Sequence, residues 1–576
     1  MLWLVLGFVS IVVPVASQTT GNNPQWDRWC GKAYQPQFPS FDPGGQIQNP
    51  PEISGPPQLN VQFKPRFSIY LSNEQKGEFV INAELSRYFG APLAESRQKA
   101  GLAYNITLDS TGKQLAAGTV AINSTRNVVS FNLAGAVEPS RTAQAVVFRG
   151  WVNADGGSNG DGDGAELRVY TARTDLFFLP DKKQGSATRI DNLNGGLQFR
   201  NTASNQTWRP LLPYGYYASY DGFLGQNDTS LIQRYAGFGL NSMTPLTTYP
   251  VSRDAFAYMG RINLPFMYDL RDNYQNNTWV EEKVRPVVDD EALYSYWGGD
   301  EPDGHQHPFN WTVDSVNLIR KLDPYHPVAV TLNCQNYYFA EYSVAADFLM
   351  EDVYPIIANS TFSKWGTACN ATYGDCGCDN CDGNVRDVSR RLEDLNRYER
   401  MLGRWPKTKF HNPQSFHGEG YWPRDPTPDE AYVMNMLAFN HGAAGMVSWL
   451  YPPTDLLATS HGELARVVTA SPVLEFLVSE GDGPYRVDVQ GLKDDQIDVA
   501  YWRKGDKEVL VNIVNPSESQ NRDGVAFPMP GSAGARIEKV LWGDTGIWEL
   551  DEGGKNIRSR TGFGKMSASL LLITLA

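Results

Sequence analysis

Between about Trp208 and Gly481 the chain alternates short apolar runs with longer amphipathic segments. The apolar runs have the length and composition of buried strands, and the amphipathic segments have a helical period. Strands are expected at 211–217, 239–244, 263–268, 292–297, 328–333, 346–352, 408–412 and 445–449. Helices are expected at 230–236, 281–291, 313–322, 385–402 and 428–441.

Strand–helix repeats over about 270 residues fit a (β/α)₈ barrel, and a doubly wound open sheet shares the same alternation. Polar or aromatic residues follow nearly every expected strand, and no Gly-rich phosphate loop occurs. We therefore favour the barrel, and we assign it to residues 205–480.

Segments without a helical period flank the barrel. Residues 59–180 hold short alternating runs such as Glu78–Asn82, which predict an antiparallel β-sandwich, and residues 481–552 predict a second, smaller one. The fold class is thus α/β, a TIM barrel between an N-terminal and a C-terminal β-sandwich. Residues 18–58 are rich in Pro, Gly and Gln and predict an extended arm.

Both ends of the chain are apolar. Residues 1–17 end in small residues suited to signal-peptidase cleavage, so we expect a signal peptide and a secreted protein. Residues 553–576 form a tail whose apolar end suggests a GPI-attachment signal or, alternatively, a frayed terminus. A formal net charge of −14 argues against nucleic acid or an anionic membrane as partner.

Sequons and cysteines agree with secretion. The expected glycosylation sites are Asn105, Asn123, Asn205, Asn227, Asn276, Asn310, Asn359 and Asn370. In an oxidising compartment the cysteines should form disulfides, with the pairing left open. They are Cys30, Cys334, Cys369, Cys376, Cys378 and Cys381. No metal site and no cofactor are expected, because His305 and His307 have no evident third ligand.

The stretch 294–304 carries the clearest chemistry. Its aromatic first half reads as a buried strand, two glycines end that strand, and Asp300 and Glu301 follow. A glutamate at the carboxyl end of a barrel strand, among aromatic residues that exclude water, is well placed to be a general acid with a raised pKa. An acidic turn without function is the alternative reading.

This arrangement resembles glycoside hydrolases of the large retaining (β/α)₈ superfamily (clan A), and in particular secreted fungal members. The motifs that carry the resemblance are YWGGDEPDG at 296–304, LDPYHPV at 322–328, MEDVYPI at 350–356, QSFHGEGYWPRDPTPDE at 414–430 and NHGAAGMVSW at 440–449. The resemblance implies that Glu301 is the acid/base residue. It also implies an Asn before that residue, where this chain has Asp300, and a nucleophile Glu ending strand seven, where it has His411 and Asn412.

Two chemistries therefore stay open. In one, Glu351, Asp352 or Glu419 is the nucleophile, or the base of an inverting enzyme. In the other, the adjacent Asp300 and Glu301 resemble the pair of substrate-assisted N-acetylhexosaminidases, in which the Asp orients the substrate's acetamido group.

The expected partner is a cell-wall or plant or fungal polysaccharide or oligosaccharide, and the oligomeric state is left open. Candidate contacts with sugar hydroxyls and rings are Tyr217, Asp221, Tyr268, Asp269, Asp303, His305, Asn333, Tyr354, Gln414 and Trp449. The competing hypothesis is a carbohydrate-binding or cell-wall protein on a barrel that has lost its second carboxylate.

Overall fold

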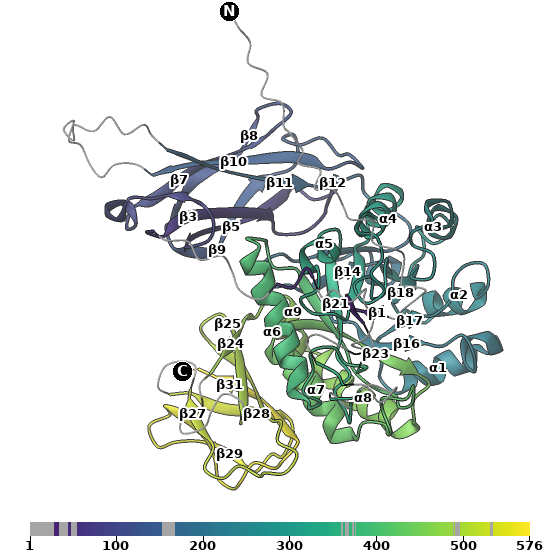
Figure 1. The fold of residues 1–576 in the computed structure, drawn as a ribbon. Helices are drawn as coiled ribbons and strands as arrows, with labels where there is room; N and C mark the ends of the chain where they lie inside the picture. Colours follow the sequence, from purple (N-terminus) through teal and green to yellow (C-terminus); the bar gives the residue numbers. More distant parts are fainter. Residues whose placement is uncertain are drawn as a thin grey trace, which may run out of the picture.

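A computed structural model describes residues 28–33, 44–47, 55–152, 168–358, 361–362, 368–370, 374, 376–487, 489, 496–529 and 534–575. The expected signal peptide, most of the expected arm and Asn359 lie outside these residues. In Figure 1 an N-terminal β-domain lies above a barrel, and a C-terminal β-domain lies beside helices α6 and α7.

The central domain is a closed barrel of parallel strands in chain order. The strands are β16 (Tyr214–Ala218), β17 (Ser242–Pro245), β18 (Phe266–Asp269), β19 (Leu293–Trp297), β20 (Val328–Leu332), β21 (Phe348–Asp352), β22 (Thr408–Asn412) and β23 (Ala443–Tyr451). β23 pairs with β16 and closes the ring. The predicted barrel with flanking β-domains is confirmed. The first strand begins later than expected, because Pro213 separates β16 from β15, which belongs to another sheet.

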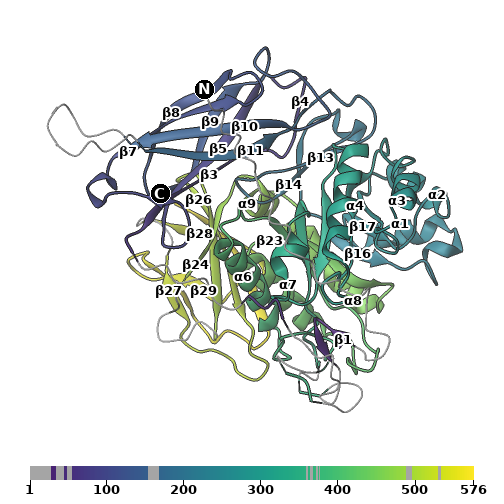
Figure 2. The same ribbon diagram turned by 45° about the horizontal axis from the view of Figure 1, so that its top comes forward.

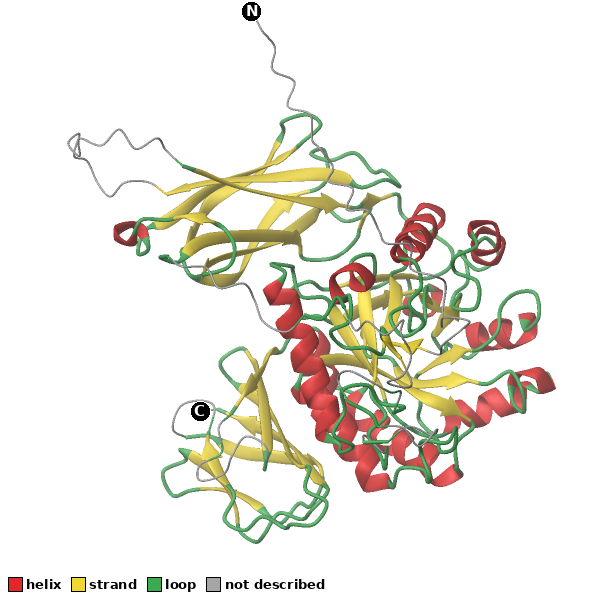
Figure 3. Cartoon of the chain, in the orientation of Figure 1, coloured by secondary structure: helices red, strands yellow, loops and turns green. Residues whose placement is uncertain are grey.

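Helices surround this barrel (Figure 3). They are α1 (Thr229–Gly237), α2 (Arg253–Arg261), α3 (Asn277–Val284), α4 (Phe309–Leu322), α5 (Phe339–Ser343), α6 (Arg386–Met401), α7 (Pro428–Asn440), α8 (Asp455–Val468) and α9 (Val473–Val478). The start of α3 lies earlier than expected, since Asn276 caps it by accepting a hydrogen bond from the Trp279 N–H. No helix of the described residues combines the length and apolarity needed to cross a bilayer.

The N-terminal domain is the predicted β-sandwich. One sheet has the order β6-β3-β5-β9 and the other β11-β10-β7-β8. The strands are β3 (Gln58–Pro65), β5 (Lys76–Ser86), β6 (Ala91–Pro92), β7 (Gly101–Leu108), β8 (Gln114–Ala121), β9 (Ser124–Asn132), β10 (Gln144–Val152) and β11 (Val169–Leu176). Aromatic rings fill the space between the sheets, and Phe79 stacks on Phe131 at 4.3 Å.

Smaller sheets join this sandwich and the N-terminal arm to the barrel. The short strands are β1 (Arg28–Trp29), β2 (Lys32–Ala33), β4 (Tyr70–Leu71), β12 (Phe178–Leu179), β13 (Ala187–Ile190), β14 (Leu197–Arg200) and β15 (Arg209–Leu211). The hairpin β1–β2 lies among the loops at one end of the barrel, far from the sandwich that follows it in sequence (Figure 2).

The C-terminal domain pairs a sheet of order β24-β25-β26-β31-β28 with a second of order β27-β30-β29. The strands are β24 (Asp482–Arg486), β25 (Asp498–Lys504), β26 (Glu508–Asn515), β27 (Ala526–Pro528), β28 (Arg536–Trp542), β29 (Trp548–Leu550), β30 (Asn556–Ser559) and β31 (Ser567–Thr574). The expected boundary at residue 552 is wrong. The apolar tail is β31, and burial of both its faces explains why it is apolar, since Leu570 faces the barrel core and Leu571 the sandwich core.

Helix α7 joins the barrel to this domain. It begins with a capping box of Thr427 and Glu430, and nearly all of its residues are buried. A helix that is apolar on every side has to be covered on every side. Here the barrel covers one face and the C-terminal sheet the other, where the Asn512 amide of β26 donates to the Met436 carbonyl at 3.0 Å.

Candidate active site

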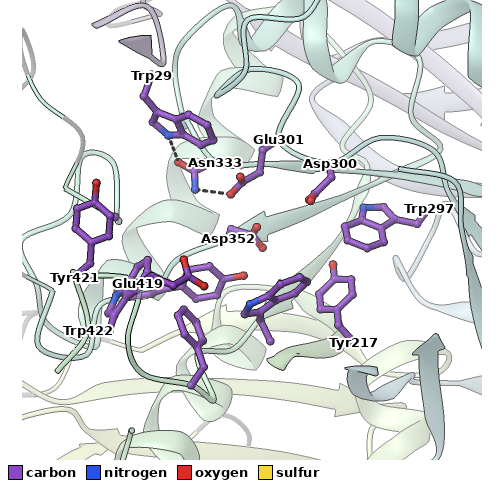
Figure 4. Close-up of a pocket in the computed structure, with 14 residues that line it drawn as sticks. Trp29, Tyr217, Trp297, Asp300, Glu301, Asn333, Asp352, Glu419, Tyr421 and Trp422 are labelled. Carbon is purple, nitrogen blue, oxygen red and sulfur yellow. Dashed lines mark hydrogen bonds between the residues drawn. The ribbon is translucent and has the colours of Figure 1, made fainter. Parts of the chain in front are cut away.

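A cavity of about 250 Å³ opens at the carboxyl ends of the barrel strands (Figure 4). Eight of its lining residues were predicted from the sequence: Tyr217, Asp300, Glu301, Asn333, Asp352, Tyr354, Glu419 and Trp449. Six were not: Trp29, Trp297, Gly377, Phe416, Tyr421 and Trp422. Carboxyl groups and aromatic rings thus share one small space, and no Lys or Arg is among the lining residues that the structure describes.

Glu301 is placed by the extension of β19 beyond its last regular residue. The Thr331 N–H donates to the Gly299 carbonyl at 3.0 Å, and the Glu301 N–H donates to the Thr331 carbonyl at 3.1 Å. Glu301 itself adopts a positive φ of 41°, which turns the chain out of the strand. The Asn333 amide then donates to Glu301 Oε1 at 2.8 Å and fixes the carboxyl group over the cavity.

The carboxyl groups of Glu301 and Asp352 lie close enough to form a hydrogen bond when one of the two carries a proton. Burial, followed by the negative charges of Asp352 and Asp300, raises the pKa of Glu301 well above its usual range. Burial also raises the pKa of Asp352. Glu301 is therefore the protonated member of the pair, and Asp352 the member that ionises first.

Asp352 is held in place by Asn412 of the neighbouring strand β22. In the register of β21 with β22 it pairs with Asn412, whose amide donates to Asp352 Oδ1 at 2.6 Å and to the Tyr217 hydroxyl at 2.9 Å. Asn412 thus stands where the family resemblance implies a glutamate. Glu351 lies outside the cavity, because neighbours on a strand point to opposite sides. Its buried carboxylate accepts from His411 Nδ1 at 2.5 Å instead.

Asp300 lies beside Glu301, between it and Trp297 (Figure 4), and keeps 28% of its side chain exposed. Burial and then the charge of Asp352 raise its pKa. Arg271 Nη1 approaches Asp300 Oδ2 to 3.7 Å, and the guanidinium lies 5.0 Å from the Trp297 ring and 5.5 Å from the Trp449 ring. This arginine was not predicted from the sequence.

Asp269 does not line the cavity and instead forms an ion pair with Arg271. Arg271 Nε lies 3.4 Å from Asp269 Oδ2. Burial raises the pKa of Asp269 to about 7.

One wall comes from the N-terminal arm. The disulfide Cys30–Cys334 joins residues 304 positions apart and brings Trp29 to the cavity. There the Trp29 indole N–H donates to Asn333 Oδ1 at 3.2 Å, so the arm braces the amide that positions Glu301. The remaining disulfides are Cys369–Cys376 and Cys378–Cys381. The Trp next to Cys30 was the one signal in the sequence for this wall.

Asp303 and His305 lie behind the cavity. The Asp303 carboxylate accepts the backbone N–H groups of Gly304, Asn333 and Cys334 at 2.8 to 3.2 Å, and burial raises its pKa to about 6. His305 packs edge-on against Trp29 at 5.0 Å. Both residues support the lining and do not belong to it.

Three further candidates lie away from the cavity. The buried Tyr268 hydroxyl accepts the Tyr249 N–H at 2.8 Å, and buried Gln414 accepts the Ile356 N–H at 2.8 Å. Asp221 lies in an exposed loop. Among the described sequon asparagines, Asn105 is half-buried and the others are exposed.

No known protein family profile matches the chain, and no curated protein is similar to it in sequence. Among solved structures, a β-glucuronidase from Ruminococcus gnavus in complex with D-glucuronic acid is 10% identical over 71% of this chain and 68% of its own, with a TM-score of 0.34. A glycosyl hydrolase family 2 member from Bacteroides cellulosilyticus is 10% identical over 90% and 76%, with a TM-score of 0.34. An α-amylase from Geobacillus thermoleovorans complexed with acarbose is 9% identical over 63% and 93%, with a TM-score of 0.39. Likeness at this level says nothing about the function of this chain, which has to be inferred from the site itself.

Proposed function

We propose that this protein is a glycoside hydrolase in which Glu301 donates the proton to the glycosidic oxygen. The observation that carries the proposal is the Glu301 carboxyl group, held by Asn333 and close to Asp300 and Asp352 in a cavity lined by aromatic rings. Sugar rings stack on such side chains, and a carboxyl group kept neutral by burial and by neighbouring charges is suited to general acid catalysis.

The chemistry then follows from the positions of the carboxyl groups. Glu301 gives its proton to the leaving oxygen as the bond from that oxygen to the anomeric carbon breaks. The Asn333 amide supports the resulting Glu301 anion, which later accepts a proton from the incoming water. Ionised Asp352 lies next to the positive charge that develops on the sugar, either as its nucleophile or as its counter-charge.

A second candidate is a substrate-assisted N-acetylhexosaminidase, and the position of Asp300 favours it. Asp300 enters the same cavity as Glu301 and lies beside a wall in which Tyr217 is 4.5 Å from Trp297 and 5.2 Å from Trp449. Such a wall can enclose an acetamido methyl group while the carboxylate accepts the amide N–H. The absence of a carboxylate at Asn412 fits this route, because the substrate then supplies the nucleophile.

Glu301→Gln on a panel of aryl glycosides tests the proposal. We expect kcat/KM to fall by about 10²- to 10⁴-fold on 4-nitrophenyl glycosides. The fall should be much smaller on 2,4-dinitrophenyl glycosides, whose leaving group needs no proton. Asp221→Asn, in the exposed loop, is the matched control and should behave like the parent. Turnover by Glu301→Gln equal to that of the parent refutes the role of Glu301, and no turnover by the parent on any glycoside favours the carbohydrate-binding protein.

Asp300→Asn separates the two routes. On the substrate-assisted route this variant loses activity on 2-acetamido glycosides, and the parent does not hydrolyse the 2-hydroxy analogues. Equal turnover of both glycoside types by the parent speaks for Asp352 instead.

We also propose that the protein is secreted and glycosylated. Three disulfides fit an oxidising compartment, and most of the described acceptor asparagines are exposed. Removal of N-glycans from the protein expressed in a eukaryotic host should lower its apparent mass. An unchanged mass would refute glycosylation.

A further inference from the structure

A second cavity, of about 560 Å³, lies between the barrel helices and the C-terminal sandwich. Helices α7 and α8 contribute Asp429, Tyr432 and Glu463, and strands β28 and β31 contribute Trp542 and Ser569. None of these residues lines the catalytic cavity.

The aromatic surface of this cavity is Trp542 with Tyr432. Trp542 ends β28, the edge strand of its sheet, and its ring meets the Tyr432 ring at 4.7 Å in a T-shaped contact. Both side chains are half-buried. The indole N–H of Trp542 has no hydrogen-bond partner among the described residues. A ring with an open face and a free N–H donor is the kind of side chain that stacks on a sugar and binds one of its hydroxyls.

Polar groups that surround these rings make few interactions within the described chain. Asp429 is exposed and makes no ion pair or hydrogen bond within the described chain. Among the described residues, Glu463 accepts the Tyr432 hydroxyl, at 2.8 Å, and no other hydrogen bond. The Ser569 hydroxyl is fully buried and has no hydrogen-bond partner in the structure, although buried polar groups are nearly always paired. Ser569 also lines the cavity.

The charge of the lining narrows the class of ligand. Asp429, Glu463 and Asp544 line the cavity, and no Lys or Arg is among its lining residues in the described chain. Carboxylates accept hydrogen bonds and repel anions. The lining therefore suits a neutral ligand rich in hydroxyl groups and disfavours acidic or sulfated glycans.

The two cavities share one loop. The loop after β22 carries Trp422 into the catalytic cavity and then leads into α7, where Asp429 lines the second cavity. Seven residues separate these two positions, and a fully extended chain of that length spans at most about 25 Å. One glycan chain of a few sugar units can therefore reach from one cavity toward the other.

We propose that this second cavity, the seam between helices α7 and α8 and the C-terminal sandwich, is a secondary binding site for a neutral glycan chain. The site would hold a polymeric substrate beside the catalytic cavity. The part that concerns hydrolysis rests on the function proposed above, whereas glycan binding at the seam stands by itself. Binding at a second point raises the effective concentration of the polymer at the first without any new contact there.

Binding is measured in the full-length Glu301→Gln background, so that hydrolysis does not interfere. The method is affinity electrophoresis in gels that contain a mixed-linkage β-glucan, a galactomannan or glycol chitin. Trp542→Ala should weaken retention by at least one of these glycans about tenfold, and Asp429→Asn about threefold. The controls are Tyr485→Ala, an exposed ring elsewhere on the same domain, and Asp254→Asn, an exposed acid in the first turn of α2 as Asp429 is in α7.

Retention of Trp542→Ala and Asp429→Asn equal to that of the Glu301→Gln parent overturns the proposal, including the case in which no glycan retards any of them. Asp429 is exposed and makes no ion pair or hydrogen bond within the described chain, so Asp429→Asn should fold normally. Its retention therefore tests the site even if Trp542→Ala folds poorly.

Kinetics in the otherwise unchanged protein test the role in hydrolysis. Trp542→Ala should lower kcat/KM about tenfold on the retained polymer and leave it unchanged on an aryl glycoside. An equal loss on both substrates overturns this role. A parent that is inactive on every substrate counts against the proposed hydrolase, while the gel experiment still decides whether the seam binds glycan.

Discussion

The contact between Glu301 and Asp352 allows the proton-donor assignment to be tested by a single charge. Asp352→Asn keeps the shape of the side chain and its oxygen acceptor for Asn412, and it removes the negative charge beside Glu301. That charge is the largest cause, after burial, of the raised pKa of Glu301. Without it the Glu301 carboxyl ionises more readily, so its pKa falls.

The size of the shift follows from the contact. Hydrogen-bonded carboxyl groups place their charges about 4 Å apart, and at an effective dielectric constant of about 20 two such charges repel by about 4 kcal/mol. This corresponds to about 3 pKa units at 1.36 kcal/mol per unit. Water in the open cavity screens part of the repulsion, so we expect the pKa of Glu301 to fall by about 1 to 3 units.

The assay is the pH dependence of kcat/KM on an aryl glycoside, whose alkaline limb reports the essential acid of the free enzyme. That limb should move to lower pH in Asp352→Asn, and Asp221→Asn should leave it in place. If Asp352→Asn abolishes turnover, infrared titration of the Glu301 carboxyl, assigned with Glu301→Gln, gives the same pKa without catalysis. An unshifted alkaline limb, or a Glu301 carboxyl that titrates at the parent's pH, would contradict the reasoning.

Three further changes have expected outcomes. Buried carboxyls such as Asp269, whose pKa is raised to about 7, bind a proton in the folded state where the unfolded chain has released it. The contribution of Asp269 to the free energy of unfolding should therefore be lost as pH rises from about 4 to about 7. Tm of the parent and of Asp269→Asn, measured across this range, shows it: the parent should lose stability relative to the variant as pH rises, and a difference that does not change with pH would be inconsistent with it. Trp29→Phe removes the donor to Asn333 and should lower kcat/KM about three- to tenfold with little change in Tm, and parental kinetics would exclude that role. Asn412→Asp places a second negative charge beside the Asp352 carboxylate and removes the amide that donates to it, so activity should fall at least about 100-fold. A gain in activity would show instead that β22 lacks only a catalytic carboxylate.

The barrel could be predicted because its strands are buried on both faces and therefore appear as short apolar runs of the right length. Strand β31 could not, because its partners β26 and β28 lie in other parts of the sequence. A terminal apolar segment looks the same whether it is a tail or a central strand.

The lining residues could be predicted where a carboxylate directly follows or ends an expected barrel strand, as for Asp300, Glu301 and Asp352. Glu351 does not line the cavity, and the sequence could not show this, because two adjacent carboxylates on one strand look alike until the register shows which of them faces the cavity. Arg271 and Trp29 were missed for another reason. Contacts between loops, and one disulfide across most of the chain, bring them to the site, and neither leaves a periodic pattern.

The bond between Cys30 and Cys334 also bears on how the protein can be produced. Cys30 leaves the ribosome long before Cys334. The Trp29 wall of the cavity can therefore be fixed in place only after β20 has formed and the N-terminal arm has packed against it. In a reducing cytosol the barrel could close without that wall and yield a soluble but incompetent product. Expression through an oxidising secretory route should therefore recover activity that the amount of soluble protein alone does not reveal.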